Sequence, residues 1–287
     1  MIPGPFAYHR PKSVQEAVAL LADLGEDARP LAGGHSLIPV MKLRLGAPSD
    51  LVDLGGIADL KGIRTEGAEI IIGAMTTQHE IIGSDLLAQR VPILRETSLL
   101  IADPQVRYMG TIGGNVANGD PSNDMPAVMM TLDATFVLAG TGGERRVAAR
   151  DFYKGIYFTA LGPGEVLTAI RITPPPAGHG YAYNKLKRKI GDYATAAAAV
   201  ILTLESGKIA SCAAALSNVG DTALFAEEAC RLLVGTALDK VSIAKARAAA
   251  EAITSPASDN HGPAEYRTKM AGVMFERALA RAFQRAQ

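Results

Sequence analysis

Two short segments, each with a pair of adjacent glycines, constrain the fold of this chain more than any other feature. They consist of Ala32, Gly33, Gly34, His35 and Ser36, and of Thr111, Ile112, Gly113, Gly114 and Asn115. Glycine lets a ligand approach the main chain closely, so consecutive N–H groups can hold an anion. One such segment is weak support for a phosphate site, but two suit the two charged centres of a diphosphate. We therefore expect the two segments to clamp a diphosphate from both sides.

The composition is that of a globular chain with balanced charge. Of its 287 residues, 48% are hydrophobic and 20% are charged, which excludes a disordered protein. The 29 basic and 29 acidic side chains cancel, so we expect no nucleic-acid partner. Cys212 and Cys230 are the only cysteines, too few for an iron–sulfur cluster with four cysteine ligands. Any metal chemistry is therefore expected in another chain.

Hydropathy predicts a cytoplasmic chain. The N-terminal residues show no charged segment followed by an apolar core, so no signal peptide is expected. The most apolar run, residues 194–204, is too short to span a bilayer, so no transmembrane segment is expected either.

Residue patterns predict an α+β protein whose first part ends at a proline run. Ser13 should cap a helix that stops at Gly25, and further helices should run from Thr76 or Thr77 through Leu87 and over residues 92–102, before Asp103-Pro104. Strands are expected at 29–32, 51–54, 70–74, 133–138, 144–149 and 165–172. Prolines at 174–176 cannot continue a strand. We therefore divide the chain into residues 1–177, with subdomains of about 1–55 and 56–177, and residues 178–287.

The second part should contain an antiparallel meander and three helices. Strands are expected at 181–187, 195–205 and 208–218, with a turn at 206–207. The alanines at 196–199 suit a helix equally well by propensity. Helices are expected at 224–233, 242–253 and 264–285.

Several common catalytic and nucleotide-binding motifs are missing. No Gly-x-Gly-x-x-Gly opens a helix, and no P-loop motif occurs, so a Rossmann domain or a P-loop enzyme is not expected. The five histidines lack metal-ligand spacing. His35 either packs beside the ligand and bonds to the backbone, or contacts a flavin, including by a covalent bond.

Asp124 and Tyr193 are further candidates for ligand contacts, and Lys185 belongs to a basic cluster of the kind that usually forms a solvated face. Asp124 either accepts hydrogen bonds from ribose hydroxyls or from the glycine segment, or caps a turn or helix. On a strand, Lys185 would share one face with Lys187 and Lys189. Tyr193 follows a tight turn, where its ring either stacks on a planar cofactor or covers a domain seam.

The two glycine segments together resemble the FAD-binding medium subunits of molybdenum hydroxylases, the family that includes xanthine dehydrogenase. Three further stretches, residues 107–110, 187–196 and 262–271, are similar to the medium subunits of the aerobic carbon monoxide dehydrogenases in that family. The resemblance covers essentially the whole chain. It implies an FAD-binding domain of two α/β subdomains, of the vanillyl-alcohol-oxidase type, and a C-terminal domain of a three-stranded antiparallel sheet with a helical bundle.

The resemblance also implies which residues touch FAD. The diphosphate would lie between the two glycine segments, and Tyr193 would lie beside the isoalloxazine ring. Four further positions match places where related flavin subunits contact FAD: Ile101, Asp124, Leu167 and Lys185. The family binds FAD without a covalent bond, which weighs against a covalent role for His35.

The implied function is electron transfer rather than substrate chemistry. Carbon monoxide would be oxidised at a molybdenum–copper cofactor in a large subunit, and electrons would pass through two [2Fe–2S] clusters of a small subunit to this FAD. The resemblance implies a heterotrimer that dimerises, quinone as the acceptor, and a peripheral place at the inner face of the cytoplasmic membrane. The alternatives are the flavin subunit of another molybdenum hydroxylase and a stand-alone flavin oxidase of the same fold.

Overall fold

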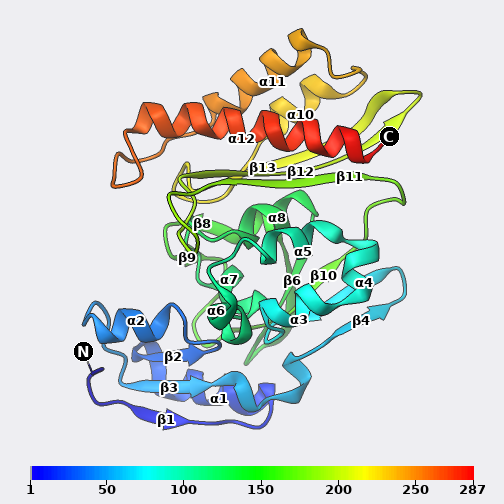
Figure 1. Cartoon of the computed structure of the whole chain (residues 1–287). Helices are drawn as coiled ribbons and strands as arrows, with labels where there is room; N and C mark the ends of the chain where they lie inside the picture. The colour runs from blue at the N-terminus through cyan, green and yellow to red at the C-terminus, as the bar shows by residue number, and fades with distance from the viewer. Residues whose placement is uncertain (1) are drawn as a thin grey trace.

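The protein has three main sheets arranged one above another, with the N-terminal part at one end (Figure 1). A computed structural model describes residues 2–287. The first sheet is parallel and has the order β1-β3-β2. Its elements are β1 (Ala7–His9), α1 (Val14–Leu24), a 3₁₀ turn (Gly25–Asp27), β2 (Ala28–Leu31), α2 (Leu37–Lys42) and β3 (Asp50–Asp53). As predicted, Ser13 caps α1 by accepting a hydrogen bond from the N–H of Glu16, and the helix ends at Gly25.

The second sheet is antiparallel and has the order β4-β5-β10-β6-β7. Two 3₁₀ turns (Leu54–Gly56 and Ala58–Leu60) lead into it. Its strands are β4 (Ile63–Glu66), β5 (Glu69–Gly73), β6 (Thr135–Gly140), β7 (Gly143–Ala148) and β10 (Val166–Ile172). The strands expected at 133–138 and 144–149 are confirmed as β6 and β7, which form a hairpin. Between β7 and β10 lie α9 (Ala149–Phe152) and a small hairpin of β8 (Tyr153–Gly155) and β9 (Phe158–Thr159).

The helices between β5 and β6 differ from the predicted ones in number and bounds. They are α3 (Gln78–Gly83), α4 (Asp85–Arg90), α5 (Pro92–Ser98), α6 (Pro104–Met109), α7 (Ile112–Ala117) and α8 (Met125–Thr131). Thr77 caps α3, but the helix predicted to reach Leu87 is interrupted at Ser84, whose hydroxyl caps α4. Asp103, expected to end a helix, instead begins α6 because its carboxylate accepts a hydrogen bond from the N–H of Val106.

The third sheet has the order β11-β12-β13-β14 and is antiparallel. It is followed by α10 (Glu227–Leu233), α11 (Lys240–Ala252) and α12 (Ala264–Arg285). The predicted meander is confirmed as β11 (Gly180–Leu186), β12 (Ala196–Glu205) and β13 (Lys208–Ser217), so the alanine run is a strand. The helix expected from residue 224 begins later, because β14 (Leu224–Phe225) first adds a short fourth strand. Helix α12 covers one face of this sheet, while α5 and α8 lie on the other (Figure 1).

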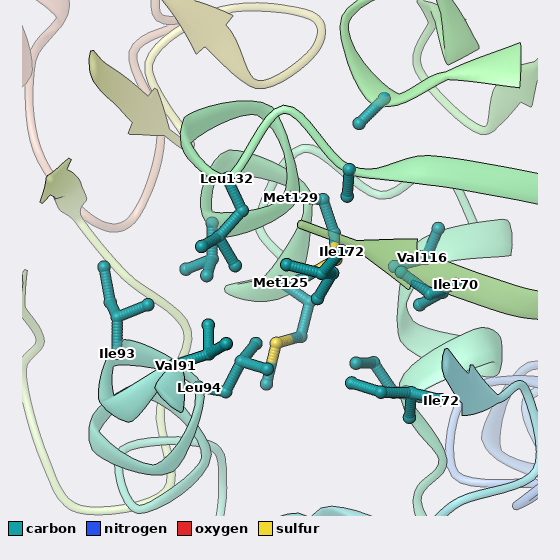
Figure 2. Close-up of a cluster of buried hydrophobic side chains, with 14 of the residues drawn as sticks. Ile72, Val91, Ile93, Leu94, Val116, Met125, Met129, Leu132, Ile170 and Ile172 are labelled. Carbon is teal, nitrogen blue, oxygen red and sulfur yellow. The ribbon is translucent and has the colours of Figure 1, made fainter. Parts of the chain in front are cut away.

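Helix α8 is the centre of the largest core cluster. All seven of its residues are buried. Figure 2 shows Met125 and Met129 of α8 among side chains from α5 and β10, including Leu94 and Ile172. The same cluster reaches β12 through Ala197. The core is therefore continuous between the second and third sheets, and this fixes the loop before α8 relative to β11.

Replacing Met129 with alanine should lower the free energy of unfolding by about 2–5 kcal/mol, because the fully buried side chain would leave a cavity. Met109→Ala is the matched control, since its side chain is exposed and should cost much less. Urea denaturation of the purified chain measures both changes. Equal losses in the two variants would contradict the central position of α8.

Candidate functional site

The two glycine segments lie directly against each other, as expected. A Cβ atom added at Gly33 would lie 2.2 Å from the carbonyl oxygen of Met109, just before the second segment. A Cβ atom added at Gly114 would lie 3.4 Å from the Cβ of Ala32. No larger residue fits at Gly33 without moving the main chain of residue 109. The glycines therefore allow two backbone segments from distant parts of the chain to touch.

The first segment presents a row of backbone donors. Among the described residues, the N–H groups of Gly34, His35, Ser36 and Leu37 have no protein acceptor. Gly34 has φ +73°, a conformation that turns the chain here and that other residues adopt rarely. His35 donates its Nδ1 proton to the carbonyl of Gly33 over 2.7 Å, which holds the ring against its own loop. Adjacent free N–H groups are donors of the kind that can hold an anion, and anion binding at this segment stays a prediction.

The second segment does not present the free N–H donors that were expected of it. It is the start of helix α7, capped by the hydroxyl of Thr111, which accepts a hydrogen bond from the N–H of Gly114 over 3.0 Å. The N–H groups of Ile112 and Gly113 donate to the carbonyls of Thr76 and Ala74, each over 2.9 Å. These three N–H groups are therefore already bonded, and the expectation of free donors is wrong for this segment.

Close packing explains the second glycine pair. A Cβ atom at Gly113 would lie 2.5 Å from both the carbonyl oxygen and the Cβ of Ala74, which directly follows β5. The side chain of Asn115 accepts a hydrogen bond from the N–H of Met125 over 3.2 Å, and its carbonyl accepts one from Asn123 over 2.8 Å. The segment thus joins β5 to the loop before α8 and packs against residues 32 and 33 of the first segment.

Asp124 and Lys185 form a buried ion pair. The Asp124 Oδ2 and Lys185 Nζ atoms are 2.9 Å apart, and the side chains are 5% and 1% exposed. Lys185 also donates to the carbonyl of Leu100 over 3.4 Å, and the hydroxyl of Tyr183 donates to Asp124 Oδ1 over 2.5 Å. Asp124 precedes α8, but its side chain makes no capping hydrogen bond. The prediction that Asp124 caps a helix is therefore wrong. Its carboxylate instead accepts hydrogen bonds from Lys185 and Tyr183.

Tyr183 also bonds to Asp124 in this site, and the sequence analysis did not identify it. Burial and the neighbouring Asp124 charge raise the pKa of Tyr183 well above its ordinary value, so its hydroxyl remains a donor. Alternation along β11 puts Tyr183 on the same face as Lys185, and this signal could have identified it. The prediction that Lys185 shares a strand face with Lys187 and Lys189 is wrong, because β11 ends at Leu186.

Tyr193 lies in the loop between β11 and β12. With 47% of its surface exposed, it is not enclosed in a seam between domains, and its ring can contact a ligand. Partial burial and the charge of Asp120 raise the pKa of Tyr193 to about 12, so the phenol is neutral at physiological pH. The loop is held by Arg188, whose Nε is 2.9 Å from Asp192.

Ile101 and Leu167 are buried in the same core cluster that contains α8. Leu167 lies at a bulge where β10 pairs with β6. Because both side chains serve the core, any ligand contact at these positions would involve main-chain atoms or the edge of a side chain. Their contact with FAD stays a prediction.

No three His, Cys, Asp or Glu side chains are grouped so as to hold a metal ion within residues 2–287. Over the same residues, no helix is both long and apolar enough to cross a membrane.

Comparisons with known proteins identify the family of this chain. Residues 4–175 match the family described as the FAD binding domain in molybdopterin dehydrogenase, and residues 181–282 match the CO dehydrogenase flavoprotein C-terminal domain. The chain is 69% identical to the carbon monoxide dehydrogenase medium chain of Afipia carboxidovorans, over 100% of both chains. It is 49% identical to the corresponding chain of Hydrogenophaga pseudoflava, over 99% of both.

A solved structure of the Cu,Mo-CO dehydrogenase in a cyanide-inactivated form contains a chain that is 69% identical to this one. The two superpose with a TM-score of 0.98, over 99% of this chain and 100% of the other. The predicted fold class is confirmed by these matches. The chain therefore belongs to the family of FAD-binding medium subunits of molybdenum-containing dehydrogenases, together with the medium chains of carbon monoxide dehydrogenase.

Proposed function

We propose that this chain holds one FAD without a covalent bond, with the diphosphate against the free N–H groups of residues 34–37. The observation that carries this proposal is the row of four unbonded donors in a segment that packs closely against the second glycine segment. The proposed contact residues are those predicted from the sequence: Ala32, Gly33, Gly34, His35, Ser36, Ile101, Thr111, Ile112, Gly113, Gly114, Asn115, Asp124, Leu167, Lys185 and Tyr193.

The proposed role of the chain is electron transfer in a carbon monoxide dehydrogenase complex. FAD is suited to this role because it can take electrons singly and pass them on in pairs. Electrons would arrive from two [2Fe–2S] clusters in a small subunit, after oxidation of carbon monoxide at a molybdenum–copper cofactor in a large subunit. Identity of 69% over the full length of a carbon monoxide dehydrogenase medium chain supports this assignment.

The proposal also covers the assembly of the complex, its electron acceptor and its location in the cell. We infer a heterotrimer that dimerises, with quinone as the external acceptor. The complex would lie in the cytoplasm, at the inner face of the membrane. For the chain itself we propose a boundary at residues 177 and 178, which the two adjoining family matches support.

Flavin analysis of the complex purified through this chain tests the proposed cofactor. Acid precipitation should release about one FAD per chain into the supernatant, because the Nδ1 atom of His35 is held by the carbonyl of Gly33. Flavin that stays in the protein pellet would contradict non-covalent binding. A complex without flavin would contradict the FAD site itself.

A further inference from the structure

A buried arginine joins segments that the FAD site uses but that lie far apart in sequence. Arg267 is the fourth residue of α12 and is 3% exposed. Its guanidinium donates to the carbonyl of Thr195 over 3.2 Å, to the carbonyl of Ala257 over 2.8 Å and to Asp259 over 2.9 Å. It also donates to the carbonyl of Asn218. Arg267 thus ties α12 to the end of the loop that carries Tyr193.

Asn218 is the second member of this network, and all of its polar groups are bonded. Its N–H donates to the carbonyl of Pro121 over 2.9 Å, and its side-chain amide donates to the carbonyl of Ala194. Its Oδ1 accepts a hydrogen bond from the hydroxyl of Ser122 over 3.1 Å. Asn218 has φ +59°, which is rare for a residue other than glycine. The structure therefore holds a less favourable backbone conformation where these contacts are made.

Together these contacts fix two loops at the candidate site against each other. The N–H and Oδ1 groups of Asn218 bond to residues 121 and 122, in the loop that ends at Asp124. Its side-chain amide bonds to Ala194, directly after Tyr193. Both loops are thereby anchored to the third sheet and α12. The main chain that carries Tyr193 is therefore placed relative to residues 120–124 by Asn218 and Arg267.

We propose that Asn218, supported by Arg267, is a positioning residue that sets the reduction potential of FAD through the placement of Tyr193. This inference rests on the proposed FAD site. Protein charges and rings beside a flavin tune its electronics, and their effect depends on their distance from it. Loss of the Asn218 side chain should therefore change the potential while FAD remains bound, because the free donors of residues 34–37 are not involved.

Asn218→Gly in the intact complex is the test variant. Glycine accepts φ +59° without strain and keeps the main-chain bonds to Pro121 and Arg267, so the fold should persist. Ser206→Gly is the matched control, since Ser206 also has a positive φ, of +52°, but lies in the exposed β12–β13 turn. FAD content, the flavin midpoint potential in a dithionite titration, and hydrogen exchange of residues 189–195 are measured in each.

Asn218→Gly should keep its FAD, and its backbone amides at residues 189–195 should exchange hydrogen faster. The equilibrium between oxidised and reduced flavin should shift about tenfold, which is about 30 mV in midpoint potential for a two-electron couple. Ser206→Gly should match the wild type in all three measurements. In a Tyr193→Ala background, Asn218→Gly should cause no further shift in potential. An unchanged potential in Asn218→Gly, or an equal shift in both backgrounds, would overturn the proposal. Wild-type complex without FAD would instead refute the proposed function, and exchange at residues 189–195 would still report whether Asn218 orders the loop.

Discussion

Gly33→Ala should remove most of the FAD from the complex. The new Cβ atom would lie 2.2 Å from the carbonyl oxygen of Met109, a distance that Cβ atoms essentially never show. The obstacle is main chain rather than a flexible side chain, so the strain can be relieved only by moving residues 32–36 or the segment between α6 and α7. Either movement displaces the free N–H groups of residues 34–37 from the positions that the diphosphate requires.

The measurement is the ratio of FAD to protein in the purified complex. Gly142→Ala is the matched control, because Gly142 is in the β6–β7 turn and an added Cβ would meet no atom within 4 Å. The control should carry as much FAD as the wild type. Full FAD content in Gly33→Ala would show that the close contact between the glycine segments is not needed for binding.

Lys185→Met should lower the free energy of unfolding by about 3–5 kcal/mol, because it leaves the Asp124 carboxylate buried without its cation. The hydroxyl of Tyr183 is a neutral donor and cannot replace a positive charge. Combining Lys185→Met with Asp124→Asn should recover most of this loss, since the amide oxygen can still accept from Tyr183 and no charge remains buried.

Urea denaturation of the purified chain measures the single and double variants. Arg231→Met is the control, because Arg231 forms an exposed ion pair with Glu228, and such pairs contribute about 0–1 kcal/mol. A double variant as unstable as Lys185→Met would mean that the unpaired charge is not the cause of the loss.

The sequence predicted most strands and the long helices because their patterns are local. Helix α12 has the predicted bounds, since Pro263 precedes it and apolar residues recur at helical spacing. Helices α6 and α7 were missed although Asp103 and Thr111 are both good N-caps. In α7 two glycines oppose helix formation, and the segment is helical because Gly113 packs against Ala74 and the N–H of Ile112 bonds to Thr76.

The sequence predicted the loops of the candidate site but not the contacts between residues that lie far apart in the chain. The two glycine pairs can be recognised directly in the sequence, and the structure brings them together. The partner of Asp124 lies 61 residues further along the chain, and no local pattern connects Asp124 with Lys185. The same is true of Arg267 and Asn218, 49 residues apart, whose contact depends on how α12 lies across the third sheet.

The most direct test of the proposed function is the visible spectrum of the complex, purified through this chain without oxygen, before and after carbon monoxide is added. Electron flow from carbon monoxide to this FAD predicts bleaching of both the flavin and the iron–sulfur bands. A flavin band that is present but stays oxidised under carbon monoxide, and is then bleached by dithionite, would contradict the assignment to a carbon monoxide dehydrogenase.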